Sequence, residues 1–436
     1  MSVEAIVERA ANLRGEAAVP GDKSISHRAL ILAAIAEGAC RIEGLATGAD
    51  VRSTASCLRA LGVRIESDGD ATVVHGAGLH GLRPPAGTLD CGNSGTTMRL
   101  LAGVLAGSGV GGVLDGDASL RRRPMGRVLD PLRAMGAEAA AVDGRAPLRI
   151  APGARLRGMH HDLPVASAQV KSALLLAGLW AEGGTSVREP ARSRDHTERM
   201  LRAFGAPIAV GEAIAIAPPG APLRAPATLR IPGDPSSAAF LLGAALLVPG
   251  GDVTVVHVDA NPTRTGFLDV LERMGAAIAR TPAGEAAGDP VATLRARHAP
   301  LRATTVGPGE IPALVDEVPL LALLATQAIG TTEIRGAGEL RVKESDRIAT
   351  TAAGLSALGA RVEELPDGLR IHGPTPLVGR EVESHGDHRI AMTLALAGLA
   401  AQGQTTVRGA ACVDVSFPGF FERLAGLAGG AARLRR

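Results

Sequence analysis

The sequence predicts an α/β protein of two domains, each made of three copies of one repeated unit. A chain of 436 residues exceeds one ordinary hydrophobic core, so two domains are expected. An Ala/Leu-rich helix with a polar, glycine-containing start recurs at a spacing of about 70 residues. A strand, a second and more charged helix, a closing glycine and another strand complete each unit. Six units divide naturally into two halves of three.

The two kinds of helix should occupy different layers. The first helix of each unit is apolar on nearly every side and should be buried, whereas the charged second helix should lie outside. With their polar starts and following strands, the apolar helices occupy residues 20–45, 92–107, 166–190, 232–258, 316–336 and 386–409. Glycines suited to a left-handed helix cap end the charged helices. These ends are LRALG (58–62), LRAMG (132–136), LRAFG (201–205), LERMG (271–275), LSALG (355–359) and a degenerate FERLAG (421–426).

The composition favours a cytoplasmic enzyme. Hydrophobic residues make up 46% and charged residues 21% of the chain, and a net charge of +2 is too small for a general polyanion binder. Six Phe, one Trp and no Tyr argue against nucleic-acid binding by base stacking. The four cysteines are scattered, which supports neither a zinc site nor a disulfide framework. The start has no secretory pattern, and the apolar run 238–248 is too short to span a bilayer, so no membrane partner is expected.

Two other architectures compete with the two-domain prediction. An open solenoid would account for the repeat, but it would not need different polar residues at each helix start. A ring clamped around DNA would need Lys and Arg along its inner helices, where this chain has Ala and Leu. A compact two-domain enzyme therefore remains the favoured interpretation.

Lysine is rare in this chain and marks three polar motifs. Of the 46 Lys and Arg residues, only Lys23, Lys171 and Lys343 are lysines. They lie in GDKSISHR (21–28), SAQVKSA (167–173) and RVKESDR (341–347). A compact ammonium fits between two ligands where a guanidinium does not. The lysines therefore point to a site, with a compositional drift toward arginine as the alternative.

The polar starts of the apolar helices predict a site for small, multiply charged acids. Helix N-termini attract anions, yet Lys23 and Arg28 add cations there, which costs stability unless an anion binds. Ser, Asn and Asp at these starts are also ordinary N-caps. Arg123 and Arg347 add fork-shaped donors suited to carboxylate and phosphate. Asp316 with Lys343-Glu344 forms either a solvated surface cluster or, in a cationic cleft, groups able to pass protons.

Eight motifs together resemble the enolpyruvyl transferases, and within them the second subclass of EPSP synthase, 3-phosphoshikimate 1-carboxyvinyltransferase. They are PGDKSISHRAL, DCGNSGTTMRLLAG, RRRPMGRVLDPL, ASAQVKSALLLAGL, SRDHTERML, ELRVKESDR, GDHRIAM and SFPGFF. The resemblance implies two α/β domains of three βαβαββ repeats with buried helices, similar to an inverse α/β barrel, and an active site in the cleft between them. It implies a domain at 22–231 that binds mainly shikimate 3-phosphate. A second domain, 1–21 plus 232–436, would carry the acid and base residues.

The implied reaction transfers the enolpyruvyl group of phosphoenolpyruvate to the 5-hydroxyl of shikimate 3-phosphate, releasing phosphate by addition and elimination. By resemblance, shikimate 3-phosphate contacts Lys23, Ser24, Arg28, Ser167, Ala168, Gln169, Arg194, Asp316 and Lys343. Phosphoenolpyruvate would contact Lys23, Gly95, Arg123, Gln169, Arg347 and Arg389. Asp316 resembles the base, Glu344 the acid, and Lys343 and Lys23 assist; which of Asp316, Lys343 and Glu344 acts at each step stays open. The resemblance implies no cofactor, metal or nucleic acid, and we expect a monomer with these two small molecules as its only partners.

Several positions depart from the better-known bacterial subclass. Ala168, Glu339 and Val415 replace a Ser, an Asn and a Lys of that subclass. Gly95 lies where some herbicide-tolerant relatives carry Ala, so glyphosate is expected to fit. The UDP-N-acetylglucosamine enolpyruvyl transferases are the nearest alternative, but they carry a reactive Cys where GDASLRRRP (116–124) has none. An RNA-end cyclase would need a nucleophilic histidine, a role that the motif histidines His27, His196 and His388 do not suggest.

Overall fold

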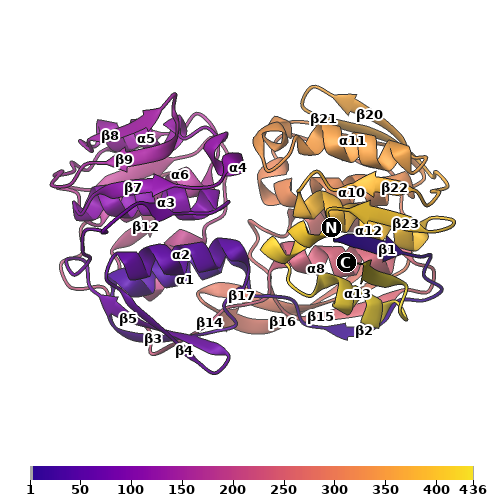
Figure 1. Ribbon diagram of the computed structural model, residues 1–436, viewed down its shortest axis with the longest axis horizontal. Helices are drawn as coiled ribbons and strands as arrows, with labels where there is room; N and C mark the ends of the chain where they lie inside the picture. The colour runs from indigo at the N-terminus through magenta and orange to yellow at the C-terminus, as the bar shows by residue number, and fades with distance from the viewer. Residues whose placement is uncertain (1–2, 436) are drawn as a thin grey trace. The chain divides into compact units, whose positions relative to one another are not determined.

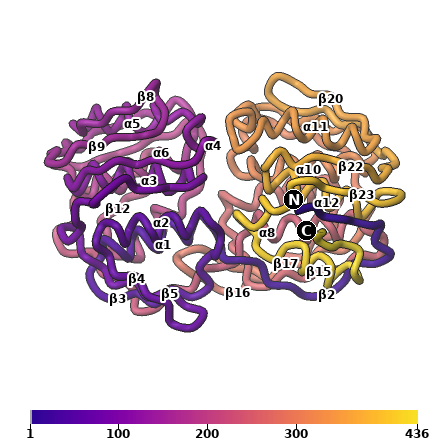
Figure 2. The backbone as a smooth tube through the Cα atoms, in the orientation of Figure 1, coloured from indigo at the N-terminus to yellow at the C-terminus, as the bar shows by residue number. Residues whose placement is uncertain are grey.

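The computed structural model describes residues 3–435 and divides them into two compact units (Figure 1). The central unit comprises Gly21–Pro232 with Glu285–Asp289. The terminal unit comprises the chain up to Pro20, Gly233–Gly284 and the chain from Pro290 onward. Met1, Ser2 and Arg436, which the predicted second domain included, lie outside the described residues. Figure 2 shows the indigo start and the yellow end of the chain within the same unit.

The central unit contains three four-stranded sheets. Its strands are β3 (Glu37–Glu43), β4 (Arg64–Asp68), β5 (Ala71–Ala77), β6 (Leu89–Asp90), β7 (Gly112–Asp115), β8 (Ala139–Val142), β9 (Arg145–Ile150), β10 (His160–Asp162), β11 (Thr185–Arg188), β12 (Ile208–Val210), β13 (Ile214–Ile216) and β14 (Thr228–Arg230). Its helices are α1 (Lys23–Ile35), α2 (Ala49–Ala60), α3 (Gly95–Ser108), α4 (Ala118–Arg121), α5 (Gly126–Ala134), α6 (Ala168–Gly178) and α7 (His196–Ala203).

The terminal unit also contains three four-stranded sheets. Its strands are β1 (Glu4–Val7), β2 (Arg14–Ala17), β15 (Asp252–Asp259), β16 (Ala277–Ala286), β17 (Asp289–Arg297), β18 (Thr305–Val306), β19 (Gly330–Ile334), β20 (Arg361–Leu365), β21 (Gly368–Gly373), β22 (Glu381–Glu383), β23 (Thr405–Arg408) and β24 (Ala432–Arg435). Its helices are α8 (Pro235–Leu247), α9 (Gly266–Arg273), α10 (Val318–Thr326), α11 (Arg347–Ala357), α12 (His388–Ala400) and α13 (Phe420–Leu427). Four short 3-10 helices cover Ile311–Ala313, Val315–Glu317, Gly338–Val342 and Ala410–Val415.

All six sheets formed by residues 3–435 share one topology. The strand order is first, second, fourth, third, as in β6-β7-β9-β8 and β10-β11-β13-β12, when β14 is counted as the first strand of its sheet and β1 as the fourth strand of its sheet. The first strand pairs in parallel with the second, and the second and fourth are antiparallel. Because β14 completes the sheet of β3–β5, while β1 and β2 complete sheets of the terminal unit, each unit closes on itself. The predicted α/β fold of repeated βαβαββ units is confirmed.

The predicted burial of the apolar helices is also confirmed. In α8 every one of the 13 residues is buried, and the Asp234 carboxylate caps the helix by accepting hydrogen bonds from the Ser236 and Ser237 backbone amides. In the charged helices α2 and α5 every arginine is exposed, whereas the valine and leucine side chains are buried, so both helices are amphipathic.

The predicted glycine caps are confirmed at five of their six positions. The five take positive φ values between 81° and 105°: Gly62, Gly136, Gly205, Gly275 and Gly359. The sixth prediction, Gly426, is wrong because α13 continues through it to Leu427, and the positive φ values fall at Gly429 and Gly430. Among the described residues, no helix has both the length and the apolar character needed to cross a membrane.

Candidate active site

In the central unit, side-chain hydrogen bonds link residues near the starts of α1, α3 and α6, with Thr54 of α2 between α1 and α3. His27 Nδ1 on α1 lies 2.7 Å from the Thr54 hydroxyl of α2, which lies 2.7 Å from Thr97 of α3. Gln169 of α6 donates to the Thr96 hydroxyl over 2.9 Å and accepts a hydrogen bond from Arg99. Three helix N-termini of one unit therefore meet, and their free amides and dipoles favour a bound anion.

Lys23 lies in the first turn of α1 and is only partly covered. Its ammonium is 3.1 Å from a carboxylate oxygen of Asp50, and about a quarter of its side chain is exposed. Asp22 caps the helix by accepting from the Ile25 amide at 2.7 Å. These acidic neighbours offset the cost of placing a cation at the positive end of the helix dipole. The sequence alone had not explained how the fold meets this cost.

Arg28, one turn further along α1, is held from three sides. Its guanidinium donates to the Thr197 hydroxyl (2.6 Å), the Ser24 carbonyl (2.9 Å) and the Ser172 hydroxyl (2.7 Å). Burial is the main reason that the pKa of Arg28 falls to about 10, and the nearby positive charge of Arg194 also lowers it. The positive charge of Arg194 therefore acts on Arg28, and a bound phosphate would offset both charges.

The start of α3 holds Gly95 beside two guanidinium groups. A β-carbon at Gly95 would lie 2.9 Å from Arg99 Nη1 and 3.4 Å from Arg123 Nη1. Arg123 also donates to the side-chain oxygen of Asn93. Ser167 caps α6 by accepting from the Val170 amide at 3.4 Å, and Ala168 begins that helix. The structure therefore brings the central-unit candidates together at the joined helix starts.

Lys171 departs from the sequence prediction that it presents an ammonium to a ligand. Only 1% of its side chain is exposed, and its ammonium lies 2.8 Å from both Glu189 and Glu198. The compact ammonium of Lys171 does fit between two groups, as predicted, but the two groups are carboxylates of the protein itself.

In the terminal unit, Arg347 is the centre of an acidic cluster. Its guanidinium lies 2.8 Å from Asp387, 2.7 Å from Glu344 and 3.2 Å from Asp316. Burial alone would lower the pKa of Arg347, but the three carboxylates raise it. Burial alone would raise the pKa of Asp387, but the positive charge of Arg347 outweighs burial, so the pKa of Asp387 is lowered. The cluster fixes both predicted proton-transfer carboxylates, Asp316 and Glu344, beside one cation.

Arg389 in the first turn of α12 is also buried among acids. It lies 3.5 Å from Glu317 and 4.0 Å from Asp316. Its Nε and Nη1 have no hydrogen-bond partner among residues 3–435. Burial raises the pKa of Glu317, although the positive charge of Arg389 opposes that shift. Arg389 thus keeps donor capacity for a carboxylate or phosphate.

Asp316, Glu344 and Lys343 are the accessible members of this terminal-unit group. Their side chains are 18%, 20% and 27% exposed, whereas Arg347 is 2% exposed. The Lys343 ammonium lies 3.5 Å from Glu339. A ligand therefore reaches the proton-transfer groups before it reaches Arg347.

Two buried histidines predict a loss of stability in mild acid. Burial lowers the pKa of His27 from 6.5 to about 3 and that of His388 from 6.5 to about 4. At a pH between the folded-state and the unfolded-state pKa of a histidine, the unfolded chain binds a proton that the folded chain does not. The free energy of unfolding therefore falls as the pH drops below about 6.5. Each histidine contributes at most about 1.4 kcal/mol per pH unit. Urea unfolding at pH 7.5 and 5 should show a smaller loss for His27→Asn than for wild type; equal losses would contradict the assignment.

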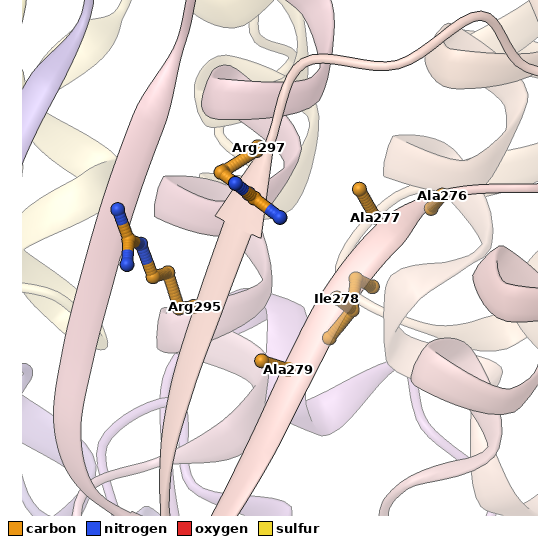
Figure 3. Close-up of a pocket in the computed structure, with 6 residues that line it drawn as sticks. All are labelled: Ala276, Ala277, Ile278, Ala279, Arg295 and Arg297. Atoms are coloured by element: carbon orange, nitrogen blue, oxygen red, sulfur yellow. The ribbon is translucent and has the colours of Figure 1, made fainter.

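One pocket of the terminal unit is shown in Figure 3, and none of the predicted site residues lines it. Its lining is Ala276, Ala277, Ile278, Ala279, Arg295 and Arg297. Arg295 is already paired with Asp252 at 2.6 Å, and the lining contains no carboxylate, thiol or histidine. The pocket has no group for proton transfer, so the helix starts remain the better candidate site.

Sequence reasoning missed the acidic partners that organise the site. Asp50, Glu189 and Glu198 were not singled out, and neither were Arg99 and Glu317. Only Glu317 had a visible signal, because it directly follows Asp316 at the start of an apolar helix. Asp50, Glu189 and Glu198 lie far along the chain from the lysines that they contact, and Arg99 lies 70 residues from Gln169, so their roles depend on tertiary structure.

Comparisons with known proteins show which family the chain resembles in sequence and in fold. The sequence matches the family described as EPSP synthase (3-phosphoshikimate 1-carboxyvinyltransferase) over residues 7–424. It is 58% identical over 420 residues to the 3-phosphoshikimate 1-carboxyvinyltransferase of Gloeobacter violaceus, covering 95% of this chain and 97% of the relative. It is 55% identical over 416 residues to that of Acidithiobacillus ferrooxidans, covering 95% of each. A solved structure of EPSP synthase from Acinetobacter baumannii aligns over 100% of both chains, with 42% identity and a TM-score of 0.88.

Proposed function

Since the chain belongs to the EPSP synthase (3-phosphoshikimate 1-carboxyvinyltransferase) family, we propose that it transfers the enolpyruvyl group of phosphoenolpyruvate to the 5-hydroxyl of shikimate 3-phosphate. This step belongs to the shikimate pathway of aromatic amino-acid biosynthesis. The single observation that carries the proposal is the family match over residues 7–424, joined to helix starts crowded with cations. Both substrates carry a phosphate, and phosphoenolpyruvate and shikimate 3-phosphate each carry a carboxylate as well.

The chemistry needs one proton acceptor and one proton donor. The 5-hydroxyl oxygen forms a bond to the central carbon of phosphoenolpyruvate, its proton goes to a base, and the methylene carbon gains a proton. The resulting tetrahedral intermediate then loses a methyl proton while its carbon–oxygen bond to phosphate breaks. The products are the enolpyruvyl ether and inorganic phosphate, so atoms and charge balance without an oxidant or reductant.

The central unit supplies cations for shikimate 3-phosphate. The charges of Arg28 and Arg194, which act on each other, support a role in neutralising the charge of this substrate, with Ser24 beside Arg28. Ser167, Ala168 and Gln169 provide a hydroxyl, a backbone amide and a side-chain amide at the start of α6. We assign Lys23 to both substrates because its ammonium is partly exposed and anchored by Asp50.

The terminal unit supplies the proton-transfer groups. Asp316 and Glu344 are held near each other by Arg347, and both are partly exposed. We assign Asp316 as the base, Glu344 as the acid, and Lys343 as an assisting cation that also contacts shikimate 3-phosphate. For phosphoenolpyruvate we assign Arg347 and Arg389 together with Gly95, Arg123 and Gln169 of the central unit. Arg389 with its unused donors is the strongest of these assignments.

A phosphate-release assay tests the proposed function directly. Purified protein should release inorganic phosphate only when shikimate 3-phosphate and phosphoenolpyruvate are both present. Release from phosphoenolpyruvate alone would indicate a phosphatase and would contradict the proposal. The net charge of +2 and the few aromatic residues support a role on small molecules rather than nucleic acid, and we propose a monomer working in the cytoplasm.

Gly95→Ala should weaken phosphoenolpyruvate binding selectively. The new methyl group would lie 2.9 Å from Arg99 Nη1 and 3.4 Å from Arg123 Nη1, the ends of flexible side chains. The fold should therefore tolerate it, while the guanidinium groups shift away from the bound anion. We expect the KM for phosphoenolpyruvate to rise about tenfold and inhibition by glyphosate to weaken in parallel. An unchanged KM for phosphoenolpyruvate, or an equal rise in the KM for shikimate 3-phosphate, would contradict the placement of Gly95.

A further inference from the structure

A buried ionic group lies directly behind the proposed shikimate 3-phosphate site. We call it the Lys171 triad: Lys171 of α6, Glu189 after β11 and Glu198 of α7. Their side chains are 1%, 4% and 3% exposed, and both ion-pair distances are 2.8 Å. The third proton of the ammonium points to the Ser193 carbonyl at 3.4 Å. All three donors of Lys171 are thus used by the protein, and none remains for a substrate.

The triad forms hydrogen bonds to the backbone segments that carry the residues proposed to bind the phosphate. Glu189 accepts a hydrogen bond from the Ser167 backbone amide at 3.0 Å. It also accepts from the hydroxyl of Ser193 at 2.6 Å and from the Ser193 amide at 3.4 Å. Ser193 directly precedes Arg194, and Ser167 is the N-cap of α6. One carboxylate therefore fixes both the helix start and the loop that carries Arg194.

The third member connects the triad to Arg28. Glu198 follows Thr197, whose hydroxyl accepts a hydrogen bond from Arg28 Nε at 2.6 Å. Glu198 is also the nearby charge that most strongly opposes the lowering of the Arg28 pKa by burial. Arg28 and Lys171 supply two positive charges, which equal in number the negative charges of Glu189 and Glu198. Removing the Lys171 charge would leave a net negative charge beside a phosphate site.

We propose that Lys171 is a positioning residue for the phosphate of shikimate 3-phosphate, acting through Glu189 and Glu198. This inference rests on the proposed function and deepens it. The compact ammonium lets two carboxylates approach from different elements, and the longer, planar guanidinium of an arginine would push them apart. Residues that hold the ligands of a metal ion in place in the same way typically cost about 10–100-fold in affinity or activity when they are lost, and we expect an effect of this size here.

The test measures binding of shikimate 3-phosphate to Lys171→Met by titration calorimetry, together with steady-state kinetics. We expect the Kd and KM for shikimate 3-phosphate to rise at least about tenfold, while the KM for phosphoenolpyruvate stays within about twofold. A purely structural role would reduce the folded fraction, which lowers kcat but leaves both KM values unchanged. Lys171→Arg should fail to restore binding, although it keeps the charge.

The matched control is Leu175→Ala, one turn further along α6 and fully buried. It should lower the Tm without changing the Kd for shikimate 3-phosphate. If Lys171→Met does not fold, Glu189→Gln has the same volume and should give the same selective rise, because one amide oxygen cannot serve both Lys171 and Ser167. Wild-type affinity in a folded Lys171→Met or Glu189→Gln protein would overturn the inference alone. Failure of the wild-type protein to bind shikimate 3-phosphate would overturn the proposed function and the inference with it.

Discussion

Replacing Lys23 by arginine should lower kcat/KM by at least about a hundredfold, although the positive charge is kept. The Lys23 ammonium sits 3.1 Å from Asp50 in the first turn of α1, where space is shared with the cap residue Asp22. A guanidinium is larger, planar and fixed in its donor directions, so it cannot contact two substrates from this position. A charged group that binds a reacting anion typically contributes about 2–4 kcal/mol to transition-state stabilisation.

The control for this variant is an arginine-to-lysine exchange at the surface. Arg64→Lys alters a guanidinium that pairs with Glu66 in solvent, and it should leave kcat/KM within about twofold of wild type. Steady-state kinetics and thermal unfolding of both variants separate an effect on turnover from an effect on folding. Near-normal turnover of Lys23→Arg would show that only the charge matters at this position.

Asp316→Asn should lower kcat by about 10²–10⁴-fold, with little change in the Tm. The carboxylate is 18% exposed and lies 3.2 Å from Arg347, so it is both reachable and held in place. Loss of a general base typically costs this factor because the proton of the attacking hydroxyl has no acceptor. The amide keeps the size of the side chain and one hydrogen-bond acceptor for Arg347.

Asp387→Asn is the informative companion, because Asp387 also binds Arg347 but is fully buried. Its folded-state pKa is lowered, so its ionised form stabilises the fold above the unfolded pKa, and this contribution is lost as the pH falls through the folded value. We expect Asp387→Asn to lower the Tm clearly at pH 7. Two results together would contradict the assignment of Asp316 as the base: Asp316→Asn lowers the Tm as much as Asp387→Asn does, and it lowers kcat no more than Asp387→Asn does. Asp316 would then be a counter-ion of Arg347.

The sequence was sufficient to predict the fold because the pattern repeats. Six apolar helices with polar starts, each followed by a charged helix and a glycine, leave few ways to bury the apolar faces. The error at Gly426 arose where the repeat is degenerate, since FERLAG continues as a helix to Leu427. The role of β1 and β2 was not visible either, because these strands complete sheets with partners far along the chain.

The candidate site was predictable in part. Cations at helix starts and the lysine motifs identified α1, α6 and the segment around Lys343. Lys171 shows what the sequence could not distinguish. Lysine is rare in this chain, and that rarity is as compatible with a lysine buried in a triad as with a lysine that binds a ligand. Only the tertiary positions of Glu189 and Glu198 distinguish the two roles. The roles assigned to Asp316, Glu344 and the arginines stay predictions until the variants are measured.

The most direct test of enolpyruvyl transfer by addition and elimination is mass spectrometry of the product formed in deuterium oxide. Protonation of the methylene carbon by solvent-exchanged acid, followed by loss of a methyl proton, should place deuterium in the vinyl group of part of the product. We expect an enolpyruvyl ether of shikimate 3-phosphate, a fraction of it one mass unit heavier, formed in step with phosphate. Phosphate release with pyruvate as the organic product, or an ether containing no deuterium, would contradict it.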